Sequence, residues 1–247
     1  MNPNISALHT IANKPERVII GLMSGTSVDG LDVALCRISG QGTQTNVQLL
    51  AFETVVYEKK FKDHIKYLTD NFQIVKFNDF SKEMSVSLSI DDGYKDTIDA
   101  VDILDQYKLP FSLFITSNNI NKSGYLTEHD VVNISRNQYC NIGAHGASHV
   151  KLGEEDYKNQ YIELKTSKDK LEAILGQEIY SMSYPHGSYN SDTLHLMREL
   201  GYQWGACSIK GFNVNDTNNY LLNRSEIISK DTSKDLLKKI EGYYDYY

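Results

Sequence analysis

The chain has 247 residues, 40% of them hydrophobic, and a formal net charge of −7. This length accommodates one large domain or two small ones with a sizeable core. The acidic balance argues against a nucleic-acid partner, because no excess of basic residues is available to neutralise phosphates.

Cysteine usage and the N-terminus bound the class of protein further. The three cysteines, Cys36, Cys140 and Cys207, are widely spaced and form no CxxC pattern, which predicts buried free thiols rather than a disulfide framework or a cysteine zinc site. The N-terminus lacks the basic start and apolar stretch of a signal peptide, and the apolar run 18–23 is too short to span a membrane. The chain as written is therefore expected in the cytoplasm, with no membrane span.

The first sixty residues predict a small sheet. VIIGLM (18–23) and LDVALCRI (31–38) are strand-like and flank SGTSVDG (24–30), and another strand is expected over 47–57. The Gly, Ser and Thr residues of the turn are typical of a tight hairpin whose backbone N–H groups can face an anion. An ordinary hairpin is the simpler interpretation, since no P-loop lysine or helix start follows.

A short charged patch at 58–63, EKKFKD, leads into a helical segment ending near Asn71 and suggests a domain boundary at about residue 60. Beyond it, strand-like and helical runs alternate, which implies parallel strands joined by crossover helices. The order of polar motifs at successive strand ends favours a barrel with its site at the C-terminal rim. The expected strands are 86–90, 111–116, 140–144, 179–184, 203–208 and 221–227, and the expected helices are 96–107, 127–136, 154–175, 191–200 and 233–240.

Two adjacent carboxylates, Asp91 and Asp92, end the alternating run VSLSI and precede Gly93. In folds of alternating strands and helices this end of a strand collects catalytic and ligand-binding groups. An Asp-Gly pair by itself is equally typical of a solvated turn.

His145 and His149 follow a strand-like run in NIGAHGASHV. With spacing i and i+4, the two imidazoles are expected on one face of a helical turn, close enough to share a metal, although two such histidines can also occur by chance. Together with the aspartate pair they predict a His-His-Asp site. Three protein ligands leave one coordination position open, as in a catalytic zinc site, and the second aspartate can serve as a base.

A third motif, SYPHGSYN (183–190), also follows a strand. Pro185 and Gly187 flank His186 and predict an exposed irregular turn that could offer a backbone N–H to an oxyanion, or simply an ordinary strand-to-helix loop.

These three ordered motifs, SIDDGYKDT, HGASH and SYPHGSYN, resemble the metal-dependent polysaccharide deacetylases of the chitin-oligosaccharide deacetylase-like group over about residues 61–247. The resemblance implies an α/β fold, a deformed (β/α)7 barrel, and hydrolysis of N-acetyl, sometimes O-acetyl, groups on a poly- or oligosaccharide. It further implies that the side chains of Asp92, His145 and His149 hold Zn²⁺ or another divalent ion and that Asp91 is the general base. The turn Tyr184–Gly187 would line the acetate and oxyanion pocket.

The chain departs from the family pattern at two points. Ser183 stands where many members carry an arginine that orients the base, and we expect Arg224 to replace it from a later strand. The late leucine-x-histidine element that supplies the general acid is missing, since no histidine follows His195. His186 is the candidate proton donor in its place, with weak turnover as the alternative.

Residues 15–57, including IIGLMSGTSVDGLDVALCRI, resemble instead the opening of anhydro-N-acetylmuramic acid kinase, which has an actin-like fold with a phosphate-contacting Gly-Thr-Ser loop. Because only this opening is present, residues 1–60 are expected to be a partial, non-functional kinase-like segment. The abrupt change near residue 60 suggests a fusion, a rearranged gene or an assembly artefact.

The leading prediction is therefore a metal-dependent sugar deacetylase acting on an acetylated glycan. The alternatives are a carbohydrate-binding barrel that has lost catalysis and a phosphotransferase derived from the first sixty residues. The sequence leaves the glycan, the native metal and the oligomeric state open.

Overall fold

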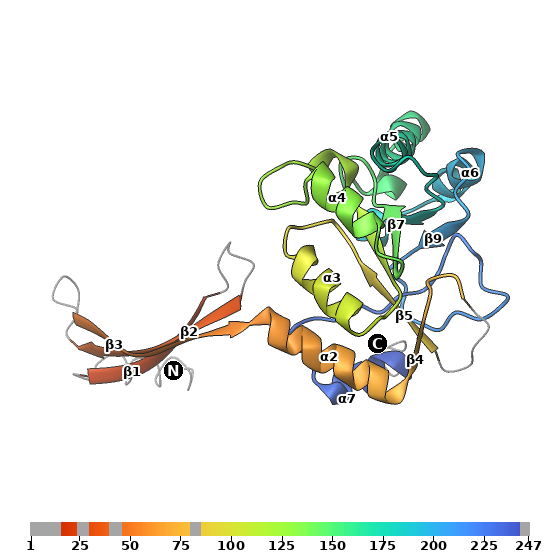
Figure 1. Cartoon of the computed structure of the whole chain (residues 1–247). Coiled ribbons are helices and arrows are strands. Elements are labelled where there is room, and N and C mark those ends of the chain that lie inside the picture. The colour runs from red at the N-terminus through yellow and green to blue at the C-terminus, as the bar shows by residue number, and fades with distance from the viewer. Residues whose placement is uncertain (1–15, 24–29, 40–45, 80–84, 243–247) are drawn as a thin grey trace, which may run out of the picture. The chain divides into compact units, whose positions relative to one another are not determined.

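The computed structural model of the protein describes residues 16–23, 30–39, 46–79 and 85–242 (Figure 1). The chain divides into two compact units, Met1–Lys60 and Phe61–Tyr247.

The first unit is a three-stranded antiparallel sheet. Its strands are β1 (Glu16–Met23), β2 (Gly30–Ser39) and β3 (Asn46–Val56), in the order β1-β2-β3. The β2–β3 register shifts between Leu35 and Cys36, a β-bulge that bends the pair. The expected small β-rich segment is thus confirmed. The expected anion-binding turn falls on residues 24–29, outside the described residues.

The second unit is built on a parallel sheet of six strands that pair in sequence order, and Figure 1 shows this sheet curled, with helices packed around it. Consecutive parallel pairing requires a crossover between each pair of strands. The predicted deformed (β/α) barrel is therefore confirmed, with six regular strands. They are β4 (Gln73–Val75), β5 (Ser85–Ile90), β6 (Phe111–Ile115), β7 (Cys140–Ala144), β8 (Ser181–Ser183) and β9 (Trp204–Ala206).

Helices precede, connect and follow these strands. Short polar side chains cap several of them: Thr127, Asn190 and Thr232 each form a capping box, which satisfies N–H groups that the first turn leaves unpaired. The α-helices are α2 (Tyr57–Asn71), α3 (Thr97–Gln106), α4 (Glu128–Ser135), α5 (Tyr157–Leu175), α6 (Ser191–Glu199) and α7 (Ser233–Ile240); the 3₁₀ turns are η2 (Ser117–Asn119), η3 (Leu152–Glu154) and η4 (Pro185–Gly187). None of the described helices combines the length and the apolar character needed to cross a bilayer.

The core lies between the sheet and the helices. Every residue of β6 is buried, as expected for a central parallel strand covered on both faces. The longest helix, α5, buries Gln160, Leu164, Ser167 and Leu171, a spacing that keeps one face on the core. This packing fixes the strands whose carboxyl ends carry the polar motifs.

Several details differ from the sequence expectations. The strand β4 was not expected, because three residues show no periodicity. The predicted strand 221–227 is instead an irregular segment with one isolated bridge, Ala206↔Leu222. The helix expected to begin at 154 begins at Tyr157, because Asp156 caps it. All three cysteines are free, but Cys36 and Cys140 are only half-buried while Cys207 is buried.

Candidate active site

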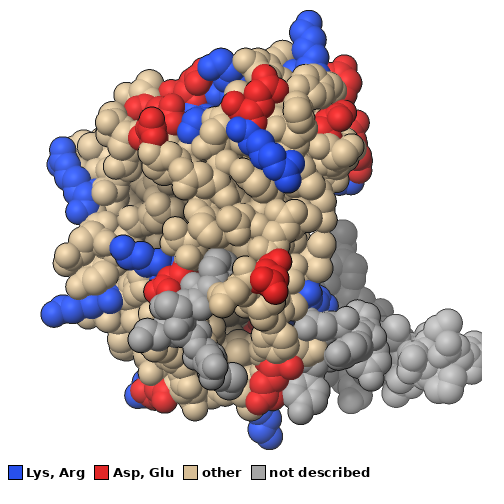
Figure 2. Space-filling model, turned by 90° about the vertical axis from the view of Figure 1, so that its right-hand side faces the viewer, with Lys and Arg blue, Asp and Glu red and all other residues tan. Residues whose placement is uncertain are grey.

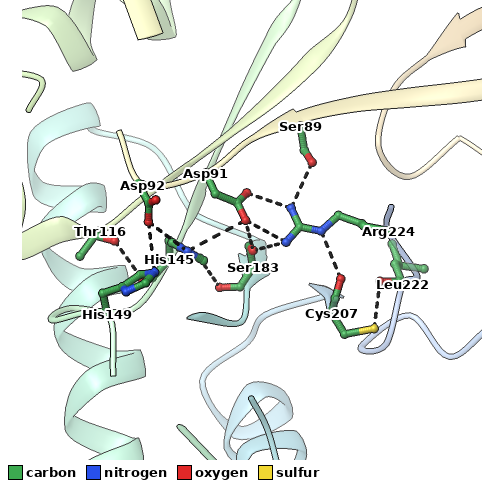
Figure 3. Close-up of polar contacts among 10 residues, drawn as sticks. All are labelled: Ser89, Asp91, Asp92, Thr116, His145, His149, Ser183, Cys207, Leu222 and Arg224. Atoms are coloured by element: carbon green, nitrogen blue, oxygen red, sulfur yellow. Dashed lines mark hydrogen bonds and ion pairs between the residues drawn. The ribbon is translucent and has the colours of Figure 1, made fainter. Parts of the chain in front are cut away.

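Two carboxylates follow β5, and Figure 3 shows them directed to different neighbours. Asp92 has a φ of 75°, so the chain turns sharply between Asp91 and the residues beyond. Gly93 has a φ of 79°, and a Cβ there would lie 3.2 Å from Cγ2 of Ile115, so the turn favours glycine. The Thr116 N–H donates to the Asp92 carbonyl at 3.3 Å, which ties this turn to the end of β6.

Asp91 is held by Arg224 in a bidentate pair (Figure 3). Nη1 of Arg224 donates to Oδ1 and Nη2 to Oδ2, both at 2.8 Å, and the Ser183 hydroxyl donates to Oδ2 at 2.9 Å. Burial by itself raises the pKa of Asp91, but the hydrogen bonds and positive charge of Arg224 outweigh it, and the pKa lies below its ordinary value. Asp91 is therefore an ionised carboxylate with a fixed orientation.

Arg224 is itself fixed on several sides. Its Nη1 donates to the Ser89 hydroxyl at 3.0 Å, its Nη2 to the Ser183 hydroxyl at 2.7 Å, and its Nε to the Cys207 carbonyl at 3.3 Å. The planar fork of a guanidinium suits such convergent acceptors. The structure brings Arg224 to Asp91 from an irregular segment, and the predicted strand for this residue is wrong.

Asp92 faces the two histidines. Its Oδ1 lies 3.4 Å from Nε2 of His145 and 3.1 Å from Nε2 of His149. The hydrogen bond with His145 is the main reason that the pKa of Asp92 is lowered. Burial, together with the neighbouring His145, lowers the pKa of His149 and favours the neutral imidazole that binds metals.

His145 is 3% exposed, and its Nδ1 lies 2.7 Å from the Ser183 carbonyl oxygen. Because a carbonyl oxygen can only accept a hydrogen bond, Nδ1 is the N–H donor of this pair, and the ring orientation that follows directs Nε2 away from Ser183. Nε2 of His145 is therefore presented toward Asp92 as a ligand atom.

The segment from His145 to His149 is an irregular loop, so the expected helical turn is wrong. His149 has a φ of 61°, and the two rings meet with centroids 4.9 Å apart because the loop folds back on itself. The chain reaches the predicted proximity by a tight turn, which sequence spacing alone does not distinguish from a helix.

This loop is clamped from two sides. The N–H groups of Ser117 and Asn118 donate to the carbonyls of Gly146 and Ala147 at 3.1 and 2.9 Å. On the other side, Oε2 of Glu163, on α5, accepts the N–H groups of Ala147 and Ser148 at 2.9 and 2.8 Å. With its backbone groups paired in this way, the loop holds the His149 ring in place.

The turn η4 places His186 beside the histidine pair. The exposed His186 ring packs against the His149 ring with centroids 4.5 Å apart, and His186 has a φ of 57°. Gly187 has a φ of 64°, and a Cβ there would lie 2.7 Å from Cβ of Ser208, so the turn requires glycine. Pro185 is buried and lies next to Gly146.

Backbone bonding singles out one N–H in this turn. The Tyr184 N–H donates to the Ala206 carbonyl at 3.0 Å and the Gly187 N–H to the Tyr184 carbonyl at 2.8 Å, while Pro185 has no N–H. Within the described residues, the His186 N–H has no such acceptor. The Tyr184 side chain is buried in the core, and its hydroxyl donates to the Tyr220 carbonyl at 2.8 Å.

The donor set suits a divalent metal ion. One oxygen of Asp92 and one nitrogen each from His145 and His149 lie within 4.8 Å of one another, which are the ligand types of mononuclear zinc sites. The hydrogen bond that fixes His145 and the clamp on its loop are the kind of outer support such sites require.

Two contributors were not identified from the sequence. Ser183 was noted only as the place of a missing arginine, yet its hydroxyl contacts Asp91 and Arg224 and its carbonyl contacts His145. Glu163 lies in the middle of an amphipathic helix, where no motif distinguishes it from other surface acids. Only the folded chain reveals what these two residues contact.

Comparison with known proteins identifies the family. The polysaccharide deacetylase family model matches residues 79–205, more than half of the chain, and covers all three motifs. The chain belongs to the polysaccharide deacetylase family. The chain is also 28% identical over 183 residues to YxkH of Bacillus subtilis, which is named as a polysaccharide deacetylase. This match covers 70% of the chain and 65% of YxkH.

Solved structures share the fold of this family member. The Streptococcus pyogenes deacetylase PplD, solved with acetate, has a TM-score of 0.68 at 22% identity, over 74% of this chain and 86% of that chain. The Bacillus cereus polysaccharide deacetylase BC0361 has a TM-score of 0.67 at 17% identity, over 86% and 78%. Both support the barrel assignment.

The N-terminal segment has different relatives. It matches the anhydro-N-acetylmuramic acid kinase of Pseudoalteromonas atlantica, with 59% identity over 66 residues, or 27% of this chain. The match spans only 16% of that kinase. The N-terminal segment therefore resembles a different family from the rest of the chain.

Proposed function

We propose that residues 61–247 form a metal-dependent deacetylase that removes acetyl groups from N-acetylated, or O-acetylated, sugars of a poly- or oligosaccharide. The observation that carries the proposal is that two adjacent carboxylates have different partners. Asp91 forms an ion pair with Arg224, whereas Asp92 lies beside His145 and His149. Zn²⁺ or another divalent ion would be held by Asp92, His145 and His149. When bound, such an ion supplies Lewis-acid chemistry, by acidifying a water and polarising the acetyl carbonyl.

In this mechanism Asp91 is the general base. Arg224 and Ser183 keep its carboxylate ionised and aimed toward the metal ligands, so that it accepts a proton from the attacking water. The hydrogen bonds from Arg224 and Ser183 also prevent rotation of the Asp91 carboxylate, which holds the base in a fixed position relative to the substrate.

The turn η4 supplies the groups that would stabilise the oxyanion and protonate the leaving amine. The His186 N–H, which lacks a backbone acceptor among the described residues, donates a hydrogen bond to the oxyanion that develops on the carbonyl oxygen of the acetyl group. The exposed His186 imidazole contacts the His149 ring and is the candidate donor of the proton that the leaving amine requires. Pro185 and Gly187 shape this turn.

The experiment is metal analysis of the purified chain beside acetate release from a panel of acetylated oligosaccharides. We expect about one divalent ion per chain and acetate release that chelation abolishes and zinc restores. Metal without acetate from any panel member would favour a carbohydrate-binding barrel instead. A chain that binds no divalent ion would contradict the metal-dependent mechanism.

We further propose that residues 1–60 are a partial kinase-like segment without a catalytic role. The match to 16% of the kinase's length supports this proposal, because a phosphate-binding turn alone does not position a nucleophile. ATP and an anhydro amino sugar incubated with the chain should give no ADP; sugar-stimulated ADP formation would contradict it.

A further inference from the structure

Two tyrosines lie beside the aspartate pair and have no role in the mechanism above. Tyr94 follows Asp92 by two residues, and its ring stacks on that of Tyr125 with centroids 4.8 Å apart and planes 26° apart. Tyr94 is 42% exposed and Tyr125 is half-buried. Because Tyr125 covers one face of the Tyr94 ring, the exposed surface of Tyr94 lies on its other face and edges.

The backbone fixes this pair. Tyr94 and Tyr125 form an isolated antiparallel bridge. The Lys95 N–H donates to the Gly124 carbonyl at 2.9 Å, and the Leu126 N–H donates to the Gly93 carbonyl at 3.0 Å. An ion pair between Lys95 and Asp130, at 2.6 Å, joins the same two segments. The rings are therefore pre-organised and do not need to be ordered when a ligand binds.

The pair also lies close to the carboxylates along the chain. Tyr94 lies two residues after Asp92 in sequence, and that length of chain spans at most about 7 Å. The backbone that carries the Tyr94 ring therefore begins beside the proposed metal ligands.

An exposed aromatic face of this kind suits a sugar ring. Tyrosine offers a flat, rigid apolar surface at low entropic cost together with a polar hydroxyl, which matches the C–H face and the hydroxyl rim of a pyranose. Single exposed aromatic residues need no explanation. Here, however, two aromatic residues are stacked, bridged through their backbones and adjacent to the catalytic carboxylates.

We propose that Tyr94 and Tyr125 form a carbohydrate-stacking platform that binds the sugar unit next to the one that loses its acetyl group. The proposal rests on the proposed function, because it takes an acetylated glycan as the ligand. The platform makes the site selective for oligosaccharides over single sugars.

The test compares Tyr94→Ala, Tyr94→Phe and Tyr107→Ala in the full chain with zinc supplied. Tyr107 is the matched control, since it is also 42% exposed but caps the C-terminus of α3, away from the carboxyl ends of the strands. Calorimetry measures binding of tetramers of β-1,4-linked and of β-1,6-linked N-acetylglucosamine and of the monomer. Acetate release is measured separately.

We expect Tyr94→Ala to weaken tetramer binding by about tenfold, with little effect on the monomer or on metal content. Tyr94→Phe should bind nearly as the wild type, because it retains the ring, and Tyr107→Ala should be unchanged. Equal binding by Tyr94→Ala and the wild type would overturn the platform, and so would equal losses in Tyr94→Ala and Tyr107→Ala.

The two proposals fail in different ways. Tetramer binding that depends on Tyr94, without acetate release, supports the platform while the proposed function fails. Acetate release by a wild type that binds no tetramer supports the proposed function while the platform fails.

Discussion

Asp91 and Asp92 are neighbours in sequence but have very different surroundings. Asp91 is enclosed by donors, with a guanidinium and a hydroxyl on its two oxygens. Asp92 faces two imidazoles, His145 and His149, and no arginine or lysine of the described part of the chain forms an ion pair with it. The positive φ at Asp92 creates this division.

The comparison shows how one strand end can supply two roles. A carboxylate that is fully hydrogen-bonded and paired with Arg224 is held in orientation, as a base requires. A carboxylate beside two imidazoles supplies an oxygen next to two nitrogen donors, as a metal site requires. The predictions below test whether the two halves of the site separate in this way.

The largest effect is expected for His145→Ala, which removes a buried ligand from the Asp92 half. We expect metal content to fall to background and acetate release to disappear with it. His195→Ala is the control, since His195 is an exposed residue of α6. Retention of stoichiometric metal by His145→Ala would remove His145 from the ligand set.

Asp91→Asn changes the other half. A general base contributes on the order of 10²–10⁴-fold to a rate, so we expect kcat to fall by that factor while metal content stays at the wild-type level. Asp102→Asn, at an exposed position of α3, should match the wild type. Equal metal loss in Asp91→Asn and His145→Ala would contradict the division of roles.

Arg224→Ala tests how the base is held. The charge of Arg224 offsets the effect of burial on Asp91, so its removal should raise the pKa of that carboxyl and move the acid limb of the pH–rate profile to higher pH. We expect a kcat lower by about 10–100-fold, with part of the loss restored in Arg224→Lys. An acid limb unchanged in Arg224→Ala would mean that Asp91 is not the titrating base.

Glu163 supports the Asp92 half from outside. Glu163→Ala removes the acceptor for two backbone N–H groups of the histidine loop, and we expect about a tenfold weaker zinc affinity in a chelator competition. Glu163→Gln retains one acceptor oxygen and should recover much of the affinity. The control, Glu154→Gln, changes an acid whose side chain is 69% exposed; an equal loss there would exclude a specific clamp.

The smallest effect concerns the metal-free protein at mildly acidic pH. The folded pKa of His149 is lowered, mainly by burial, from an ordinary value of 6.5. As the pH falls below about 6.5 the unfolded chain takes up this proton first, so stability declines until the pH reaches the folded pKa. Thermal melts between pH 7.5 and 5 should show this decline, and His149→Gln should reduce it.

Much of the fold followed from local pattern. The alternation in Val86–Ile90 and the run at Phe111 predicted strands close to those observed. The helices predicted at 127–136, 191–200 and 233–240 also lie close to α4, α6 and α7. The strand β4 was not predicted, because its three residues are too few to show an alternating pattern of apolar and polar side chains.

The site was less accessible to sequence reasoning. Motifs identified Asp91, Asp92 and the two histidines as candidates, but the conformation of the histidine loop depends on contacts with η2 and α5 that are distant in sequence. The Ser183 contacts follow from tertiary packing, because hydroxyl and carbonyl positions at a strand end have no periodic signature. Tyr184 was expected at the site on motif position alone, and its side chain lies in the core.

The guanidinium that holds Asp91 comes from 133 residues further along the chain. During synthesis from the N-terminus, the segments that carry Asp92, His145 and His149 are all complete well before residue 224 is added. A ribosome-bound chain would therefore hold every proposed metal ligand while its base still lacked its cationic partner. The nascent protein therefore becomes competent for the proposed catalysis only after residue 224 has been added.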